Sequence, residues 1–350
     1  MKTFIFLLSV MITIVSCNQS GKNKKPATAD TLTEKKKDTV VVLPRILPDD
    51  SDVGVKKGAV FIYKNRGFKL SSGGASMGKA YASVINQYNR LKIPGLKIYN
   101  LIIPNGFEFE VREKYKNLAK PAKEAINEVF AAEDPEIIKI NPVDELRRHR
   151  TEYLYFHTDH HWTSLGAYYA YKSFCASAGL TPVVLDSIPS KVKPNFLGFF
   201  YRLTKSAILK NNPDSVRYYL FPDSVNFFIG SKAIGYWAPS HMYAEQASGD
   251  NSYSVFLQGD LPICKMETQH KNGRRIALVK ESYGNAFAPF LINNYEKVIV
   301  VDQRSYKGDF INMLKAEYIN ELLFINNIFA AHTQFHIDDI KNLAFRGANK

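Results

Sequence analysis

The sequence is poor in cysteine and tryptophan, with three and two residues among 350. Cys17, Cys175 and Cys264 stand far apart and no histidine pair accompanies them, which argues against a thiolate zinc site. Zinc-finger spacing, an RNA-binding signature and an arginine-rich helix are all missing, so a nucleic-acid role lacks support despite a net charge of +13. With 45% hydrophobic and 13% aromatic residues, disorder of the whole chain is also excluded.

Long apolar runs are missing except at the N-terminus, and that run is shorter than the ~20 residues of a bilayer-spanning helix. Residues 1–16 place Lys2 before the run, which is typical of a secretory signal. Ser16 then precedes Cys17, an arrangement similar to the lipobox of bacterial lipoproteins, in which the cysteine is lipidated. An ordinary cleaved signal with an incidental cysteine is the alternative. We expect a lipid-anchored protein of the cell envelope that faces the periplasm.

Residues 17–53 are rich in Lys, Thr, Asp, Ser and Pro without a sustained apolar period, and we interpret them as a flexible tether after the lipidated cysteine. Part of the basic excess belongs to this tether. The remaining positive charge fits either lysines scattered over solvated faces or an anionic partner. The folded domain should occupy residues 54–350. Within it, Cys175 and Cys264 could pair in an oxidising envelope or remain as two buried thiols.

Beyond residue 54, short β-branched runs alternate with helical patterns, which indicates an α/β fold with a parallel sheet. A segment at about 185–265 interrupts the alternation with aromatic residues, prolines and polar breaks, and it predicts an irregular or antiparallel insertion. Strands are expected at 59–63, 97–103, 137–140, 275–279 and 298–301. Helices are expected at 79–91, at 164–178 and up to residue 286, with one or two helices at 108–130 and a helix followed by a strand at 318–324. Thr163 or Ser164 should cap the helix that ends at Gly179.

The densest polar cluster, residues 155–163, lies just before that helix, in a loop at the edge of the sheet. Asp159 and His161 are two residues apart, so both side chains face the same way in an extended loop. The carboxylate can then orient the imidazole as a general base, although a purely structural pair fits the spacing equally well. A metal site on Asp159, His160 and His161 is a third reading, disfavoured because three adjacent residues rarely converge on one ion.

A second cluster, residues 280–286, places Ser282 where a strand ends and a helix begins. Backbone N–H groups at such a junction can bind a developing oxyanion, but a serine there is also a common helix cap. Ser76 is a competing nucleophile, because residues 74–78 fit the G-x-S-x-G elbow of α/β-hydrolases. In that fold the acid and the histidine come from separate late loops. Here the one well-placed pair of Asp and His is two residues apart.

Four segments together resemble the DHHW protein family, which is SGNH-hydrolase-like and related to the alginate O-acetyltransferases. The segments are residues 158–171, which begin Thr-Asp-His-His-Trp, and residues 101–105, 280–291 and 300–306. The resemblance covers roughly residues 58–330. It implies a flavodoxin-like three-layer α/β/α fold with a permuted motif order, in which Ser282 is the nucleophile, His161 its general base and Asp159 the orienting carboxylate. Glu281 departs from the aspartate usual before the serine.

Further residues are candidates for contacts with the reacting substrate. Beside the N–H of the nucleophile, Asn285 and Gly198 are candidate oxyanion donors. Trp162 and Tyr155 could form an aromatic wall against a sugar, with core packing as the alternative. Arg304 could bind an anionic group of the substrate or form a structural pair with the aspartate two positions before it.

The resemblance implies acetyl transfer to or from a surface polysaccharide through a seryl ester, with neither cofactor nor metal. Relatives of this kind work beside a membrane-bound O-acyltransferase, which is therefore the expected partner, together with the polysaccharide and the membrane. A carbohydrate esterase is the enzymatic alternative, because water can release the same ester. A non-catalytic glycan-binding lipoprotein is the alternative from another class.

Overall fold

The computed structural model describes residues 53–70, 74–222, 224–230 and 236–345. The expected signal sequence, Cys17 and the tether up to residue 52 lie outside the described residues. No helix within the described ranges is both long and apolar enough to span a bilayer.

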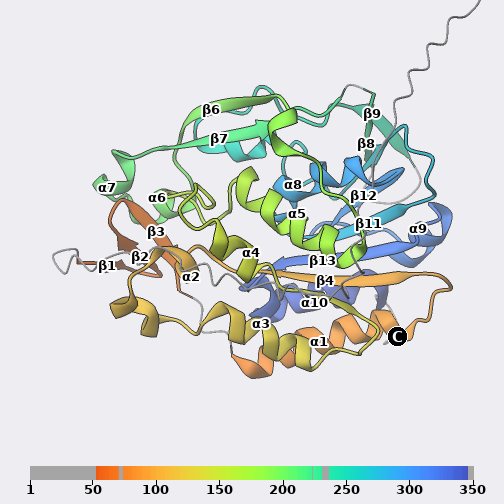
Figure 1. The fold of residues 1–350 in the computed structure, drawn as a ribbon, viewed down its shortest axis with the longest axis horizontal. Coiled ribbons are helices and arrows are strands. Elements are labelled where there is room, and N and C mark those ends of the chain that lie inside the picture. The colour runs from red at the N-terminus through yellow and green to blue at the C-terminus, as the bar shows by residue number, and fades with distance from the viewer. Residues whose placement is uncertain (1–52, 71–73, 223, 231–235, 346–350) are drawn as a thin grey trace, which may run out of the picture. The chain divides into compact units, whose positions relative to one another are not determined.

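A central sheet organises the described residues, with strand order β5-β4-β13-β11-β12-β10-β8-β9 (Figure 1). The first five strands in this order run parallel to one another, as the alternating pattern predicts. Their residues are largely buried because helices cover both faces, which explains the continuous apolar runs. These strands are β5 (Ile138–Ile140), β4 (Lys97–Ile103), β13 (Glu321–Asn327), β11 (Arg275–Lys280) and β12 (Lys297–Asp302).

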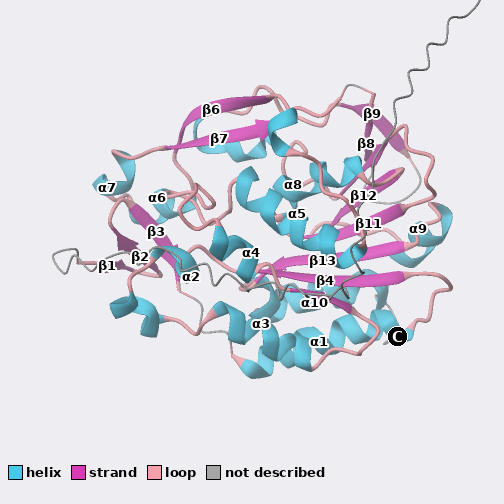
Figure 2. Cartoon of the chain, in the orientation of Figure 1, coloured by secondary structure: helices cyan, strands magenta, loops and turns pink. Residues whose placement is uncertain are grey.

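Helices form the two outer layers, as Figure 2 shows. One layer contains α1 (Ala75–Arg90), α3 (Ala122–Ala131), α9 (Phe310–Ala316), η5 (Ala330–His332) and α10 (Gln334–Phe345). The other contains α4 (Val143–Arg148), α5 (Ser164–Ala178), α8 (Gly284–Phe287) and η4 (Ala288–Asn293). The bounds of α5 agree with the sequence: Thr163 Oγ1 accepts from Gly166 N at 3.3 Å, and Gly179 ends the helix in the left-handed region at φ 66°.

The segment at 185–265 is antiparallel and irregular, as expected. Strands β6 (Ser190–Phe196) and β7 (Asp214–Tyr219) pair with each other outside the central sheet. Strands β8 (Asn226–Gly230), β9 (Trp237–Ser240) and β10 (Ile263–Glu267) extend the central sheet in antiparallel fashion beside β12. Short helices lie between them: η2 (Leu185–Ser187), α6 (Phe199–Thr204), α7 (Ala207–Lys210) and η3 (Gly249–Val255).

The apolar run at 59–63 forms a strand, but not in the parallel sheet. It is β2 (Val60–Tyr63), which pairs antiparallel with β1 (Val55–Lys57) and β3 (Arg66–Lys69) in a separate three-stranded sheet. Two-residue turns join these strands, and such short connections permit only antiparallel pairing. The small sheet packs on α2 (Phe107–Glu110) through its own apolar cluster.

Of two helix predictions, one holds in its two-helix form and one is wrong. The stretch at 108–130 contains the two α-helices α2 and α3 with η1 (Glu113–Leu118) between them, and Pro121 precedes α3 because proline is compatible with a helix start but not with its interior. Residues 318–324 contain no helix: α9 ends at Ala316, Tyr318 adopts the left-handed region at φ 54°, and β13 begins at Glu321.

Candidate active site

The candidate site lies at the carboxyl edge of the parallel strands, where ligands bind in open α/β sheets (Figure 1). Strand β11 ends at Lys280, and the chain turns through Glu281 and Ser282 before α8 begins. The loop with Asp159 and His161 precedes α5 and crosses to the same place. The two motifs, 121 residues apart, therefore meet in one site.

Ser282, His161 and Asp159 form a continuous hydrogen-bonded chain. His161 Nε2 lies 2.7 Å from Ser282 Oγ, and His161 Nδ1 lies 2.6 Å from Asp159 Oδ1. Asp159 and His161 are buried, whereas Ser282 is partly exposed to solvent. The arrangement has the geometry that a serine nucleophile, a general base and an orienting carboxylate require.

The Asp159 carboxylate is held from several sides. The backbone N–H of His161 donates to Oδ1 at 3.0 Å, and that of Phe199 donates to Oδ2 at 2.7 Å. Burial alone would raise the pKa of Asp159. The neighbouring imidazoles of His160 and His161, together with these hydrogen bonds, instead hold the pKa below its usual range. Asp159 is therefore an ionised hydrogen-bond acceptor for His161 at neutral pH.

The loop that carries Asp159 is fixed by Asp214, a residue that sequence reasoning missed. Asp214 is buried at the start of β7. Its carboxylate accepts from His157 N at 2.8 Å, Thr158 N at 2.7 Å and Thr158 Oγ1 at 2.5 Å, and also from the hydroxyl of Tyr153. The insertion thus anchors the residues immediately before the candidate catalytic carboxylate.

Tyr253, from η3, is a second residue that sequence reasoning missed. Its ring stacks on the His161 imidazole with centroids 4.0 Å apart and planes 12° apart. Its hydroxyl donates to the carbonyl oxygen of Ser282 at 3.0 Å. One side chain therefore contacts both the candidate base and the backbone of the candidate nucleophile.

Ser282 does not serve as a helix cap. Helix α8 begins at Gly284, with Tyr283 at the cap position and no side-chain cap hydrogen bond. Besides His161, Ser282 Oγ contacts Glu281 Oε2 at 3.3 Å. Among the described residues the Ser282 N–H donates to no acceptor, which leaves it available to an oxyanion.

Glu281, the departure from the family pattern, has a definite place. The N–H of Asn327 donates to Oε1 at 3.0 Å, and the N–H of Tyr283 donates to Oε2 at 3.2 Å. Glu281 therefore connects the end of β11 with the end of β13. Burial raises the pKa of its carboxyl group, and the two backbone donors oppose that rise.

Arg304 and Asn285 are committed to an ionic cluster in which Lys280 and Asp302 are buried and Asp260 is exposed. Arg304 Nε and Nη2 lie 2.9 and 2.6 Å from the two oxygens of Asp302, and Nη2 lies 2.8 Å from Asp260. Lys280 Nζ lies 2.8 Å from Asp302, and Asn285 Nδ2 donates to Asp260 at 2.9 Å. This geometry corresponds to the structural alternative for Arg304. It also turns the Asn285 amide toward Asp260.

Gly198 has a different role from the expected oxyanion donor. Its N–H donates to Thr158 Oγ1 at 2.9 Å and is therefore occupied. A Cβ atom at this position would lie 2.2 Å from the Cβ of Asp159, closer than atoms can approach. Gly198 thus allows the backbone at the start of α6 to approach the Asp159 carboxylate.

The two candidate wall aromatics are both largely buried. Trp162 is fully buried, and its Nε1 donates to Tyr283 O at 3.0 Å, so it packs beneath the site and cannot face a sugar. Tyr155 is also buried, and its hydroxyl donates to Pro104 O at 2.7 Å. Unlike Trp162, Tyr155 lines a pocket beside the triad.

The candidate metal ligands Asp159, His160 and His161 place one ligand atom each within 4.8 Å of one another. Two of the three are already engaged, because Asp159 accepts from His161 and Phe199 and His161 Nε2 contacts Ser282, whereas His160 Nδ1 has no hydrogen-bond partner among the described residues. An ion would have to break this chain of hydrogen bonds.

Two further expectations concern residues away from the site. Ser76 lies exposed in the first turn of α1, and no histidine or carboxylate among the described residues hydrogen-bonds to it. Cys175 and Cys264 are both buried and unpaired, so the disulfide left open by the sequence is not formed.

Comparison with known proteins agrees with this architecture. The profile of the DHHW protein family matches residues 45–301. A DHHW family protein from Eubacterium siraeum superposes with a TM-score of 0.76 and 28% identity, over 84% of this chain and 98% of that chain. Bacillus cereus PatB1 gives a TM-score of 0.65 and 17% identity, over 81% and 99% of the two chains. No curated protein matches the sequence significantly. The expected SGNH-hydrolase-like α/β fold is thus confirmed.

Proposed function

Because the chain belongs to the DHHW protein family, we propose that it is an acyltransferase that moves an acetyl group to or from a surface polysaccharide through an ester on Ser282. The observation that carries this proposal is the hydrogen-bonded chain from Ser282 through His161 to Asp159. A buried, ionised carboxylate that orients an imidazole toward a partly exposed hydroxyl has the features of a nucleophilic acyl-transfer site.

The first half of the reaction forms the seryl ester. As Ser282 Oγ attacks the acyl carbonyl, its proton passes to His161 Nε2, and the Ser282 N–H donates to the developing oxyanion. The tetrahedral intermediate collapses, the bond to the donor oxygen breaks, and His161 returns the proton to that oxygen. Asp159 stabilises the imidazolium that exists between the two proton transfers.

The second half transfers the acyl group to an acceptor hydroxyl. His161 removes the proton of the acceptor, the new ester bond forms, and the proton returns to Ser282 Oγ as the seryl ester breaks. If water replaces the acceptor, the same site is a carbohydrate esterase. The partial exposure of Ser282 favours this second candidate, because water has access to the ester.

The proposal also concerns the cellular setting. Lipidation of Cys17 and the tether would hold the catalytic domain at a membrane, on the periplasmic side of the cell envelope. A membrane-bound O-acyltransferase is the proposed source of the acyl group. Both the anchor and this partner rest on the resemblance of the sequence to lipoproteins and to acetyltransferases.

The decisive experiment is Ser282→Ala, assayed with an activated acetyl ester. Release of acetate should fall about a thousandfold or more, and acetylated protein should no longer accumulate in intact-mass spectra. Thermal unfolding should change little, because the hydroxyl caps no helix and one hydrogen bond contributes about 1 kcal/mol.

Ser76→Ala is the matched control and should keep full activity. Full turnover by Ser282→Ala would refute the mechanism. Absence of turnover in the wild-type protein would favour a glycan-binding role. With an oligosaccharide present, acetylated sugar identifies the transferase and free acetate alone identifies the esterase.

A further inference from the structure

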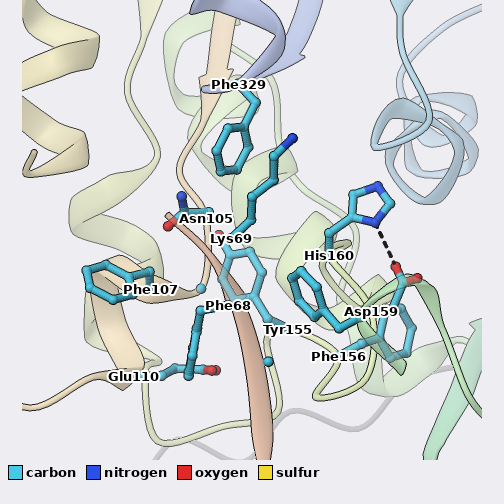
Figure 3. Close-up of a pocket in the computed structure, with 13 residues that line it drawn as sticks. Phe68, Lys69, Asn105, Phe107, Glu110, Tyr155, Phe156, Asp159, His160 and Phe329 are labelled. Atoms are coloured by element: carbon cyan, nitrogen blue, oxygen red, sulfur yellow. Dashed lines mark ion pairs between the residues drawn. The ribbon is translucent and has the colours of Figure 1, made fainter. Parts of the chain in front are cut away.

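A pocket of about 290 Å³, including the open space at its mouth, lies next to the candidate triad (Figure 3). Five separate parts of the chain form it: strand β3, the segment after β4, the loop that carries Asp159, helix α6 and the segment after β13. Asp159 and His160 form the wall nearest the triad, and the His160 ring is 3.9 Å from the His161 ring between centroids. Most of the remaining lining is aromatic: Phe68, Phe107, Tyr155, Phe156, Phe200 and Phe329.

Lys69, at the end of β3, places a cation on the rim of this pocket. Its Nζ lies 4.2 Å from the centroid of the Phe329 ring, and Figure 3 shows its side chain extending beside that ring. Within the described residues, no hydrogen bond or ion pair engages this ammonium group; burial lowers the pKa of Lys69, and the nearby negative charge of Glu281 opposes that shift without direct contact. An ammonium that rests on an aromatic face and has no acceptor retains its capacity to bind an anion.

The carboxylates that line the pocket already have partners. Glu110 forms an ion pair with Arg66 at 2.7 Å, and Asp159 accepts from His161 and Phe199. His160 is not a second cation, because burial and the neighbouring His161 lower its pKa to about 3.

Asn105, just beyond β4, adds an amide to the lining, and its side chain has no hydrogen-bond partner among the described residues. The uncommitted polar groups are thus one cation and one amide, set among aromatic rings. Aromatic rings pack against the apolar faces of sugar rings, and a few placed polar groups then fix the orientation of the ligand.

We propose that this pocket is a subsite for a saccharide unit that carries an acidic substituent, with Lys69 pairing with the acid and Asn105 contacting a hydroxyl. The inference rests on the proposed function, and it places this unit next to the one whose ester is formed or broken at Ser282. The contact between the ring of His160, which lines the pocket, and the ring of His161 supports that adjacency. The substrate class is therefore an anionic polysaccharide.

The test measures binding directly, with the full chain and two trisaccharide probes. One is a galacturonic acid trisaccharide, and the other is its carboxyl-reduced, neutral counterpart. Calorimetry at low ionic strength should give about fivefold tighter binding of the acidic probe, the range of a partly exposed ion pair, and added salt should reduce the preference. Lys69→Met should abolish the preference, and Lys69→Arg should restore most of it.

Lys57→Met is the matched control, because Lys57 is an exposed lysine of the same small sheet that does not line the pocket. This variant should keep the preference of the wild-type protein. Equal binding of the two probes by the wild type, or an unchanged preference in Lys69→Met, would overturn the subsite.

Acetylation of Ser282 in the wild-type protein is measured separately. If the preference for the acidic probe depends on Lys69 but Ser282 is not acetylated, the proposed enzymatic function is contradicted and the subsite is not. If Ser282 is acetylated but no such preference is found, only the subsite is contradicted.

Discussion

At the scale of single residues, the candidate site depends on a close approach that only glycine permits. Gly198 lies against Asp159, and an added Cβ would meet the carboxyl oxygen Oδ2 at 2.3 Å. The carboxylate of Asp159 cannot move away from such a Cβ atom without losing its hydrogen bonds with His161 Nδ1 and Phe199 N. The orientation of His161 therefore depends on the absence of a side chain from a neighbouring segment.

Gly198→Ala should lower the turnover of an activated acetyl ester at least about tenfold, because displacement of Asp159 misorients the base. Gly74→Ala is the control, since no atom lies within 4 Å of a Cβ placed there. Steady-state kinetics and circular dichroism of both variants make the comparison. Wild-type turnover by a folded Gly198→Ala protein would contradict the importance of this contact.

Tyr253 contributes to the site in two separable ways. Tyr253→Phe removes the hydroxyl that donates to Ser282 O but keeps the ring on His161. We expect a reduction of a few fold in kcat, in line with one lost hydrogen bond of about 1 kcal/mol. Tyr253→Ala should reduce kcat more strongly, because the imidazole also loses its stacking partner. Equal kcat values for the two variants would show that the ring contributes nothing.

At the scale of elements, strand β7 controls the loop that precedes α5. Asp214 accepts hydrogen bonds from a side chain and the backbone at Thr158, next to Asp159. In Asp214→Asn the side chain keeps its shape, but an amide NH₂ replaces one carboxylate oxygen. This donor would face backbone N–H groups that need an acceptor. The variant should lose about 1–3 kcal/mol of stability and turn over the ester more slowly. Asp250→Asn, an exposed aspartate in η3, is the control for the unfolding and kinetic measurements. Unchanged kinetics would limit Asp214 to a structural role.

The sequence predicts elements that are defined by local signals, but it does not predict roles that depend on contacts between distant segments. The helix after Thr163 carries its own capping residues, and the strand before Ser282 contains a continuous buried apolar run from Ile276 to Val279, so local signals define both. Asp214 and Tyr253 lie in the insertion, where no periodicity marks them, and their roles arise from contacts with residues 29 to 92 positions away. The clash that explains Gly198 is likewise a contact between distant segments.

At the scale of the whole molecule, a chain of buried polar groups crosses the central sheet. Asn100 donates to Glu133 Oε1 at 2.5 Å, and Tyr81 donates to Asn100 at 3.0 Å. Asn326 contacts the Tyr81 hydroxyl at 3.3 Å and accepts from Gln303 at 2.9 Å. The chain joins α1 to strands β4 and β13. Its charged end, Glu133, is buried with one carboxylate oxygen, Oε2, that has no partner among the described residues.

Burial raises the pKa of Glu133 to about 7, although Asn100 and Lys139 oppose this rise. Below about pH 4 the carboxyl group is protonated in both the folded and the unfolded chain, and it adds no pH dependence. Between about pH 4.5 and 7 the unfolded chain releases this proton more readily than the folded one. The free energy of unfolding therefore falls with rising pH over this window.

Glu133→Gln should remove that dependence, because the amide oxygen still accepts from Asn100 while no charge is buried. We expect the variant to match the wild-type protein near pH 4.5 and to exceed its unfolding free energy by about 2–3 kcal/mol at pH 8. Denaturant unfolding at both pH values provides the measurement. Glu136→Gln, an exposed neighbour, should show no such gain. A constant difference between Glu133→Gln and the wild type across the pH range would mean that Glu133 does not titrate in this window.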